Sequence, residues 1–291
     1  MRVAVVGVGA MGSRVALRLL GAGHDVVVWN RSPDRAASLA DAGATVARTP
    51  CEATSGTAYV ITMLADPAAL LEVVTAADGL REGLVQGQTV LEMSTVGPSA
   101  VRAVGGLLPA GAELLDTPVL GSLSEVDAGT LTVFAGGPPD LVAAARPLLD
   151  DLASSVLHVG PLGAGAAAKL VANATLLGTL GVLGEALAIG TALGLDPDRI
   201  FDVLATTPLA AQAERRRPIL SGEDVPVRFR LALAEKDAAL IAGEGTLAGA
   251  DVRLLAEVEG WFHDAVRAGA GERDYSAVVR HIVDAVQPPD D

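Results

Sequence analysis

The stretch Gly160–Asn173, GPLGAGAAAKLVAN, lies near the middle of the chain and opens a long apolar segment. The pattern of this segment predicts one helix that runs to about Leu193. Lys169 and Asn173 are the only strongly polar side chains in its first half. Because they are four residues apart, they share one face of a helix, one turn from each other. An ammonium and an amide aligned on an apolar helix call for an explanation from the rest of the chain.

The composition limits the classes of protein to which this chain can belong. It has 291 residues, 51% hydrophobic and 19% charged, which suits two domains or one large one with a sizeable core. A net charge of −14 disfavours nucleic acid and anionic membranes as partners, because both repel an acidic surface. Cys51 is the single cysteine, so we expect no intrachain disulfide and a reducing, cytoplasmic location. The apolar segment after Lys169 is long enough for a membrane span, but its polar residues favour a buried helix.

A glycine-rich turn follows the apolar run at the start of the chain. Residues 2–8 predict a strand that leads into GVGAMG, a helical pattern follows, and residues 25–30 (DVVVWN) predict a second strand. Such a unit is typical of a dinucleotide-binding fold. Gly7 allows the tight turn, Gly9 lets the backbone approach a pyrophosphate, and Gly12 allows close packing of helix on strand. An S-adenosylmethionine site can use a similar turn and is the alternative. The predicted cofactor-binding residues of the turn are Gly7, Gly9, Ala10, Met11 and Gly12.

The end of the second predicted strand discriminates between the two nicotinamide cofactors. NAD sites place Asp or Glu there, where the carboxylate binds the ribose hydroxyls. This chain instead has Asn30, Arg31 and Ser32. A carboxylate would repel a 2′-phosphate, whereas Arg31 can pair with it through a charge-assisted fork. We therefore expect NADP(H) rather than NAD(H); a solvated loop charge is the alternative for Arg31.

Further strands are expected in the N-terminal half, with helical patterns between the earlier ones, at residues 59–64, 89–93 and 113–119. Ligands of such sheets collect at the carboxyl ends of the strands. This rule places Met63, Leu64, Ser94 and Thr95 around the cofactor. Ser94 and Thr95 precede a new helical pattern, so both could equally serve as N-cap residues.

The remaining chain changes from mixed to helical patterns. Residues 116–137 predict strand, loop and strand, and they are followed by a helix at 140–152 and a strand at 155–159. Beyond residue 195 we expect only helices, separated by loops and followed by a frayed tail at residues 287–291. The predicted loops contain Pro208, Arg215–Pro218 and Ser221–Pro226.

The composition of the central helix and the scattered histidines allow two more expectations. Three glycines, Gly178, Gly181 and Gly184, are costly in an exposed helix, so they indicate close packing against another backbone. The four histidines and Cys51 show no metal-ligand spacing, and we expect no metal site.

Taken in order, the motifs resemble those of the NAD(P)-dependent β-hydroxyacid dehydrogenases, over nearly the whole chain. This family includes 3-hydroxyisobutyrate dehydrogenase and the glyoxylate/succinic semialdehyde reductases. The resemblance implies an N-terminal Rossmann domain, assigned to residues 1–161, and an all-helical substrate and dimerisation domain, residues 162–291, joined by a long interdomain helix. It also implies a small-molecule substrate and a homodimer. The motifs are GVGAMG (7–12), EMST (92–95), DTPVLGS (116–122) with AGTL (128–131), GAGAAAKLVAN (163–173) and Lys236-Asp237.

The same resemblance assigns roles to individual residues. Lys169 would be the catalytic residue, Asn173 would hold the substrate beside it, and Lys236 would lie against the nicotinamide. The substrate's carboxylate end would be lined by Leu120, Gly121 and Ser122. The family commonly has Ser-Gly-Gly at this triplet, and its serine binds the substrate carboxylate. Because Leu120 cannot donate a hydrogen bond from its side chain, Ser122 or the backbone N–H groups would have to take over.

These assignments lead to a functional prediction. Hydride transfer to a carbonyl leaves an alkoxide that must be protonated, and a positioned lysine can act as the general acid. We expect NADP(H)-dependent hydride transfer between the nicotinamide and a short 3-hydroxy acid, its semialdehyde or glyoxylate. One alternative is an imine reductase of the same fold, although imine reductases usually carry Asp or Tyr in place of Lys169. The other is a non-catalytic NADPH-binding sensor. The related 6-phosphogluconate dehydrogenases are much longer than this chain.

Overall fold

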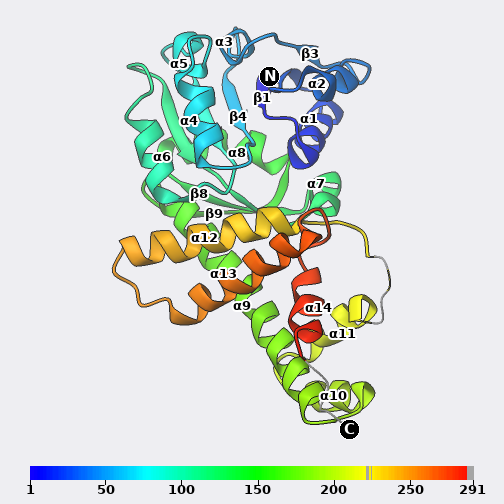
Figure 1. Ribbon diagram of the computed structural model, residues 1–291. Helices are drawn as coiled ribbons and strands as arrows, with labels where there is room; N and C mark the ends of the chain where they lie inside the picture. Colours follow the sequence, from blue (N-terminus) through cyan, green and yellow to red (C-terminus); the bar gives the residue numbers. More distant parts are fainter. Residues whose placement is uncertain (221–222, 224, 287–291) are drawn as a thin grey trace. The chain divides into compact units, whose positions relative to one another are not determined.

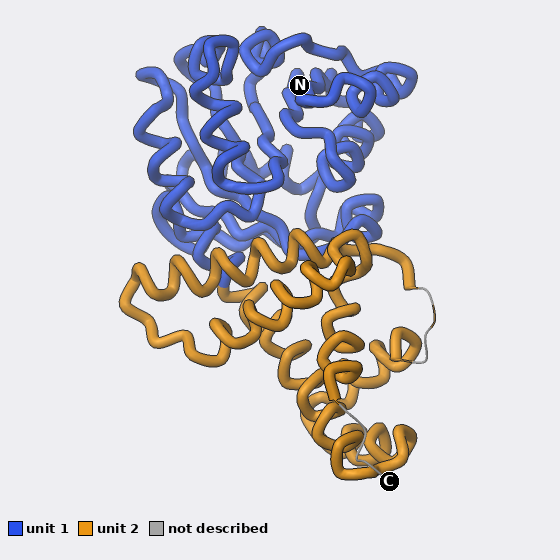
Figure 2. The backbone as a smooth tube through the Cα atoms, in the orientation of Figure 1, with its two compact units in different colours: residues 1–170 blue, residues 171–291 orange. Residues whose placement is uncertain are grey.

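The computed structural model describes residues 1–220, 223 and 225–286, and the chain divides into two compact units, residues 1–170 and 171–291 (Figure 2). The division falls inside one continuous helix, α9 (Ala164–Ala192). The predicted domain boundary after residue 161 precedes this helix. The expected frayed tail at residues 287–291, and part of the expected loop at 221–226, lie outside the described residues.

Unit 1 is built on a sheet whose first six strands are parallel and have the order β3-β2-β1-β4-β5-β6. This order is that of a Rossmann fold, as predicted. Strand β8 lies antiparallel to β6 and β7 and parallel to β9, so that the described residues contribute nine strands to one sheet. The strands are β1 (Arg2–Val6), β2 (Asp25–Trp29), β3 (Thr45–Val46), β4 (Tyr59–Thr62), β5 (Thr89–Glu92), β6 (Glu113–Asp116), β7 (Val119–Leu120), β8 (Leu131–Gly136) and β9 (Ala153–Gly160).

Helices cover both faces of this sheet, because its central strands are apolar on both sides. Ile61, Leu91 and Leu115 point to one face and pack with α1, α2, α7 and α8. Val60, Val90 and Leu114 point to the other and pack with the remaining helices of the unit (Figure 1). The helices are α1 (Ala10–Gly21), α2 (Pro33–Ala40), α3 (Pro50–Ala53), α4 (Pro67–Thr75), α5 (Leu80–Gly83), α6 (Gly97–Gly105), α7 (Leu123–Ala128) and α8 (Pro139–Asp150).

Helix α7 occupies part of the segment that the sequence pattern predicted to be a loop between two strands, and that prediction is wrong. Its start is a capping box, in which the Ser122 side chain meets the backbone of Glu125 and the Glu125 side chain meets the backbone of Ser122. Gly129 ends the helix in the left-handed conformation, with a φ of +68°. The Ser-x-x-Glu spacing was therefore the local signal for this helix.

The first turn of α9 is bound by a buried carboxylate of the sheet. Asp116, the last residue of β6, is fully buried. Its two side-chain oxygens accept the N–H groups of Gly163 at 2.9 Å and Ala166 at 2.7 Å. These N–H groups lie at the helix N-terminus and have no acceptor within the helix, so Asp116 satisfies donors that would otherwise be buried without a partner. Burial raises the pKa of Asp116, while the hydrogen bonds from Gly163 and Ala166 oppose that rise.

Unit 2 is helical, as predicted. Beyond α9 it contains α10 (Pro197–Leu204), α11 (Ala210–Leu220), α12 (Leu231–Leu247), α13 (Arg253–Ala265), the π-helical turn η1 (Val266–Ala270) and α14 (Ala277–Asp284). The expected loop at Arg215–Pro218 is wrong, because α11 continues through Pro218. One side of α11 is held by burial of its residues Ala213, Arg216 and Ile219, which favours the helix over a break at proline.

The glycines of α9 are sites of close packing, but against side chains rather than the backbone that we expected. A Cβ on Gly181 would lie 2.7 Å from Cγ2 of Val258 on α13. A Cβ on Gly184 would lie 2.5 Å from Cδ1 of Ile282 on α14. The missing side chains therefore allow α13 and α14 to pack onto α9 in unit 2.

Among the described helices, α9 alone is long and apolar enough to cross a membrane by length and composition. Half of its most apolar window is buried inside the protein. Core helices of proteins that never meet a membrane satisfy the same criteria, and Lys169 and Asn173 would be costly in lipid. These observations favour the predicted buried helix.

The contact between Asp116 and α9 generates a stability prediction. In Asp116→Asn one carboxylate oxygen becomes an NH₂ group, so either Gly163 or Ala166 loses its acceptor. We expect unit 1 to lose about 1–3 kcal/mol of unfolding free energy, the cost of one unsatisfied buried donor. The measurement is urea unfolding followed by Trp29 fluorescence in a Trp261→Phe background, since the chain has two tryptophans. Asp140→Asn is the control, because Asp140 lies exposed in the first turn of α8. Equal losses in both variants would contradict the role of Asp116.

Candidate functional site

The glycine-rich turn between β1 and α1 has a conformation that only glycine allows. Gly7 has a φ of +96°, and a Cβ on it would lie 2.4 Å from the carbonyl oxygen of Met63. A Cβ on Gly12 would lie 2.0 Å from the carbonyl oxygen of Gly7. At Gly9, in contrast, the nearest atom to an added Cβ is Nη1 of Arg35, 3.9 Å away. The turn therefore leaves no room for a side chain at Gly7 and Gly12, whereas space remains beside Gly9.

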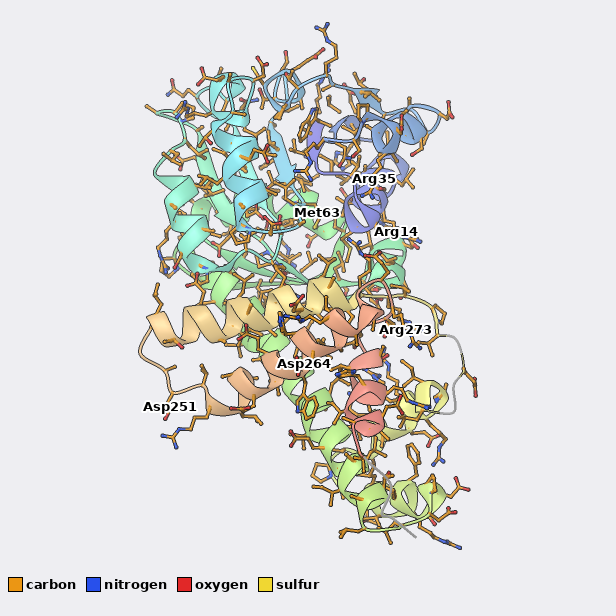
Figure 3. All side chains as sticks on the ribbon, viewed as in Figure 1. Arg14, Arg35, Met63, Asp251, Asp264 and Arg273 are labelled. Atoms are coloured by element: carbon orange, nitrogen blue, oxygen red, sulfur yellow. The ribbon has the colours of Figure 1, made fainter. Side chains whose placement is uncertain are left out.

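Helix α1 offers its N-terminus at this open side. It begins at Ala10, its N-cap Gly9 provides no side-chain hydrogen bond, and its first turn contains no acidic residue. The first-turn N–H groups and the positive end of the helix dipole favour an anion at this position. Arg35, labelled with Met63 in Figure 3, adds a guanidinium close to Gly9. These features fit the pyrophosphate of a dinucleotide.

The residues after β2 divide between structural and exposed roles. Asn30 accepts the N–H of Val8 through Oδ1 at 3.1 Å and donates to the carbonyl of Ser32 at 3.0 Å, so its amide connects the glycine turn to the end of β2. Ser32 is the exposed N-cap of α2. The Arg31 side chain is 81% exposed and lies 3.7 Å from Glu72, a pair that contributes little to stability at such exposure. Arg31 is thus able to exchange Glu72 for an anionic ligand.

The carboxyl ends of β4 and β5 are joined by side-chain hydrogen bonds. The N–H of Leu64 donates to Oγ of Ser94 at 2.8 Å, and the N–H of Ser94 donates to Oε1 of Glu92 at 2.6 Å. The hydroxyl of Thr62 donates to Oε2 of Glu92. Met63 and Leu64 are half-buried and both approach Gly7, while Thr95 is half-buried on the same loop as Ser94. Four of the predicted cofactor-binding residues thus belong to one edge of the sheet.

In the Leu120–Ser122 loop the serine makes hydrogen bonds within the protein. Leu120 is 40% exposed, and Gly121 has a φ of +138° with Leu131 and Glu125 packed against it. The Ser122 hydroxyl donates to Oε2 of Glu125 at 2.6 Å, and the Ser122 N–H donates to the same oxygen at 2.8 Å. The hydrogen bonds from Ser122 hold the pKa of Glu125 down at about 2. Glu125 is therefore an anion at neutral pH, and it already accepts the hydroxyl expected to serve the substrate.

Lys169 lies on the same helix as the N–H groups bound by Asp116. It follows Ala166 by three residues and is 9% exposed. Residues three apart share a helix face, so the hydrogen bonds of Asp116 fix both the starting point and the rotation of the turn that carries Lys169. Within unit 1 the position of this ammonium is thus tied to the end of β6.

In unit 2, Asn173 and Lys236 meet the same carboxylate. Asp237 on α12 is 2% exposed. Its Oδ2 accepts Nδ2 of Asn173 at 2.7 Å, and its Oδ1 lies 2.6 Å from Nζ of Lys236. A buried carboxylate paired with an ammonium and an amide orients both groups. Asn173 and Lys236 were predicted separately, and Asp237 is what joins them.

Three functional candidates were missed as site residues. Glu92, Asp116 and Asp237 each lie inside a motif, but residue type and spacing alone do not predict that they contribute to a site. All three are buried carboxylates that accept hydrogen bonds from predicted site residues or from the helix that carries them. A buried carboxylate is recognised only from its partners, which come from distant segments. Across the described ranges, no group of three or more His, Cys, Asp or Glu residues is arranged to hold a metal ion.

The use of lysine in this chain is unusually restricted. Of 21 lysine and arginine residues, only two are lysines, Lys169 and Lys236. Both fall at predicted site positions, and their exposure is low: 9% for Lys169 as a residue and 22% for the Lys236 side chain. An ammonium is a compact point charge on a flexible stem, whereas a guanidinium is a planar fork. The two lysines are therefore candidates for a role that arginine cannot fill.

Comparison with known protein families assigns almost the entire chain. Residues 2–160 match the NAD binding domain of 6-phosphogluconate dehydrogenase. Residues 163–282 match the family described as NAD-binding of NADP-dependent 3-hydroxyisobutyrate dehydrogenase. The two matches meet at the start of α9.

Individual relatives agree with this assignment. Glyoxylate/succinic semialdehyde reductase 1 of Arabidopsis thaliana is 29% identical over 287 residues, covering 97% of this chain and 98% of the relative. The 3-hydroxyisobutyrate dehydrogenase of Pseudomonas aeruginosa is 34% identical over 203 residues, 69% of this chain and 68% of the relative. The solved structure of Mycobacterium tuberculosis 3-hydroxyisobutyrate dehydrogenase with L-serine has a TM-score of 0.85 at 28% identity, covering 97% and 98% of the two chains. The chain therefore belongs to the β-hydroxyacid dehydrogenase family of NAD(P)-dependent oxidoreductases.

Proposed function

We propose that this protein is an NADP(H)-dependent oxidoreductase that interconverts a short semialdehyde or glyoxylate with the corresponding hydroxy acid, with Lys169 as general acid/base. The observation that carries the proposal is that the chain has only two lysines, Lys169 and Lys236. They fall at the two positions to which the motif resemblance assigns functional lysines. Family membership supports the reaction class. A homodimer in the cytoplasm is part of the same proposal.

The binding of the cofactor would use the edge of unit 1 described above. The glycine turn and the N-terminus of α1 would hold the pyrophosphate, with Arg35 adding positive charge. Arg31 would face the adenosine 2′-phosphate, since no carboxylate stands at the end of β2 to repel it. Met63, Leu64, Ser94 and Thr95 would line the nicotinamide half. The bound cofactor supplies or accepts the hydride.

The remaining chemistry is a proton transfer at the substrate oxygen. Lys169 would donate a proton to that oxygen during reduction and take it back during oxidation. Asn173, one turn further along α9, would hold the same part of the substrate, with its amide oriented by Asp237. Lys236 would contribute positive charge beside the nicotinamide. NADPH preference favours the reducing direction in a cell.

The Leu120–Ser122 loop favours an aldehyde substrate whose acid end is recognised without a serine hydroxyl. Ser122 is occupied by Glu125, and Leu120 presents an apolar side chain at the position where the family has its carboxylate-binding serine. The direct test is an NADPH-oxidation screen over glyoxylate, succinic semialdehyde, methylmalonate semialdehyde, tartronate semialdehyde and a cyclic imine. Activity on the imine with none on the aldehydes would identify an imine reductase instead. Binding of NADPH without oxidation by any of them would identify a sensor.

The role of Lys169 predicts the behaviour of two substitutions. Lys169→Ala removes the proton donor, and Lys169→Arg keeps the positive charge but cannot release a proton. We expect both variants to lose about 10²–10⁴-fold in kcat, while the Kd for NADPH measured by fluorescence changes only a few-fold. Activity retained by the arginine variant would show that Lys169 acts by charge alone, and near-normal turnover of the alanine variant would refute any catalytic role.

The role of Arg31 predicts a change in cofactor preference. In Arg31→Ala the 2′-phosphate loses a charge-assisted partner worth about 1.5–3 kcal/mol, which is roughly a 10- to 150-fold loss in NADPH affinity. The Kd for NADH should stay the same, because NADH has no 2′-phosphate. Arg48→Ala is the matched control, since Arg48 is an exposed arginine of the same unit that pairs with Glu52. An unchanged ratio of NADPH to NADH affinity in Arg31→Ala would refute the assignment.

The Leu120–Ser122 loop predicts how carboxylate recognition can be restored. Leu120→Ser places a free hydroxyl in the loop, so kcat/KM for succinic semialdehyde should rise relative to an uncharged aldehyde of equal length, by roughly 10- to 150-fold for one hydrogen bond to a charged group. Ser122→Ala should leave this ratio unchanged, because the hydroxyl of Ser122 serves Glu125. A fall of the ratio in Ser122→Ala would show that Ser122 binds the substrate after all.

A further inference from the structure

A row of polar side chains crosses the sheet of unit 1 at the carboxyl ends of its central strands. Thr62, Glu92 and Asp116 are the last residues of β4, β5 and β6, and they are paired in register with one another. Register partners on parallel strands point to the same face, so the three side chains are neighbours. All three are buried, with exposures of 0%, 1% and 0%. Burying two adjacent carboxylates away from water is energetically costly, so their presence here requires an explanation.

The two carboxylates have different partners. Asp116 accepts two N–H groups at the N-terminus of α9, where the helix dipole favours a negative charge. Glu92 accepts the N–H of Ser94 and the hydroxyl of Thr62, which are uncharged. The groups that act on the charge of Glu92 are Asp116 from β6, Thr62 from β4 and Ser94 from the following loop, and of these only Asp116 is charged. Glu92 is therefore the member of the pair that more readily keeps a proton.

The titration of Glu92 falls close to neutral pH. Burial raises the pKa of Glu92 to about 7, the nearby Asp116 adds to the rise, and the hydrogen bonds from Ser94 and Thr62 oppose it. Ionisation of Glu92 places a second negative charge beside Asp116, and a positive charge brought near would relieve that repulsion. The site is thus sensitive to a cation at the end of the strands.

Glu92 also holds the backbone of the edge where the cofactor would bind. Ser94, whose N–H it accepts, in turn receives the N–H of Leu64 through Oγ. The neighbouring carbonyl of Met63 packs against Gly7. In a dinucleotide fold the adenosine half lies over β1 and β2, so the half of the sheet formed by β4, β5 and β6 receives the nicotinamide. The oxidised nicotinamide carries a positive charge that the reduced ring lacks.

We propose that Glu92 is a positioning residue that holds the nicotinamide edge of the sheet and releases a proton to solvent when the oxidised, cationic cofactor binds. The inference rests on the proposed function, because it requires a nicotinamide cofactor at this edge. The exchange is balanced: the carboxylic acid loses one proton, the carboxylate remains beside Ser94 and Thr62, and no bond of the cofactor changes. Binding of the reduced cofactor leaves the proton on Glu92.

The hydrogen bonds around Glu92 survive either protonation state. As a carboxylate it accepts from both Ser94 and Thr62. As a carboxylic acid it accepts from the N–H of Ser94 with one oxygen and donates to the Thr62 hydroxyl with the other. Glutamine repeats the second pattern without being able to ionise. Glu92→Gln therefore removes the charge while retaining the hydrogen-bond geometry. If the role of Glu92 were merely structural, this variant would behave as the wild type.

The test is isothermal titration calorimetry of NADP⁺ and NADPH near pH 7 in buffers with different ionisation heats, which counts the protons released. The 2′-phosphate, which titrates at about pH 6, loses the same number of protons with either cofactor, so the difference between the two cofactors is the readout. We expect the wild type to release more protons with NADP⁺ than with NADPH, by a fraction of one proton, and Glu92→Gln to release equal numbers with both. The ratio of NADP⁺ to NADPH affinity of the wild type should rise between pH 6 and pH 8, by up to about tenfold for each unit by which the cation lowers the pKa of Glu92. In Glu92→Gln this ratio should be flat. Glu113→Gln, at the exposed opposite end of β6, should behave as the wild type.

The protein without cofactor provides a second readout. Because the pKa of Glu92 is raised from 4.5 to about 7 on folding, the protonated side chain stabilises the fold at low pH, and this contribution is lost as pH rises from about 4.5 to 7. The unfolding free energy of Glu92→Gln should lack that decline. If the variant does not fold, carbon-13 NMR of the wild-type glutamate carboxyls should still show one titration near pH 7 that moves downward with NADP⁺ only.

The same difference in proton release between NADP⁺ and NADPH in the wild type and in Glu92→Gln, or no such difference in the wild type, would overturn the proton exchange and leave the proposed function intact. Failure of the wild type to bind any nicotinamide nucleotide would overturn both. An excess of protons released with NADP⁺ over NADPH that is absent in Glu92→Gln and present in Glu113→Gln would establish the exchange.

Discussion

The arrangement of unit 1 around the site depends on the hydrogen bonds between the Asp116 carboxylate and the start of α9. The carboxylate joins the last residue of β6 to the first turn of α9 through two charge-assisted hydrogen bonds. An α-helix turns by about 100° and rises by about 1.5 Å for each residue. A shift of this turn by one residue would therefore rotate Lys169 away by a quarter of a circle or more. One buried anion thus sets the direction in which the only lysine of unit 1 points.

Side chains that hold backbone are a general feature of this unit. Asn30 binds the N–H of Val8, Ser94 binds the N–H of Leu64, and Glu92 binds the N–H of Ser94. In each case a residue at the end of a strand, or just beyond it, fixes the loop of the neighbouring strand or of its own strand. The loops that would meet a cofactor are therefore ordered by hydrogen bonds made before any ligand arrives, which lowers the conformational entropy lost on binding.

The sequence was sufficient for the features that depend on local pattern. The glycine turn, the parallel strands and the helical second half are encoded by residue types at fixed spacing, and the Rossmann and helical architecture is confirmed. The predictions were wrong where contacts between residues distant in sequence determine the local structure. The helix α11 continues through Pro218 because its buried side is packed, and the glycines of α9 meet side chains of α13 and α14 rather than backbone. The helix α7 is different, since its Ser122-x-x-Glu125 box was visible in the sequence and was overlooked.

The candidate site divides in the same way. Gly7, Gly12 and Lys169 could be named from motifs, whereas Glu92, Asp116 and Asp237 become candidates only when their partners are known. Carboxylates are common on protein surfaces, and nothing in a single sequence separates an exposed Asp from one that accepts two helix N–H groups. Ser122 is the opposite case. Its residue type suggested a contact with the substrate, but its hydroxyl already donates a hydrogen bond to Glu125.

The scarcity of lysine has a practical consequence for labelling chemistry. The side-chain primary amines of this sequence are those of Lys169 and Lys236. Amine-reactive esters and aldehydes, which modify most proteins at many surface positions, would here meet two poorly accessible side chains. The rate at which the two lysines are modified would report directly on their accessibility, and a bound ligand that covers them would appear as protection in a mass spectrum.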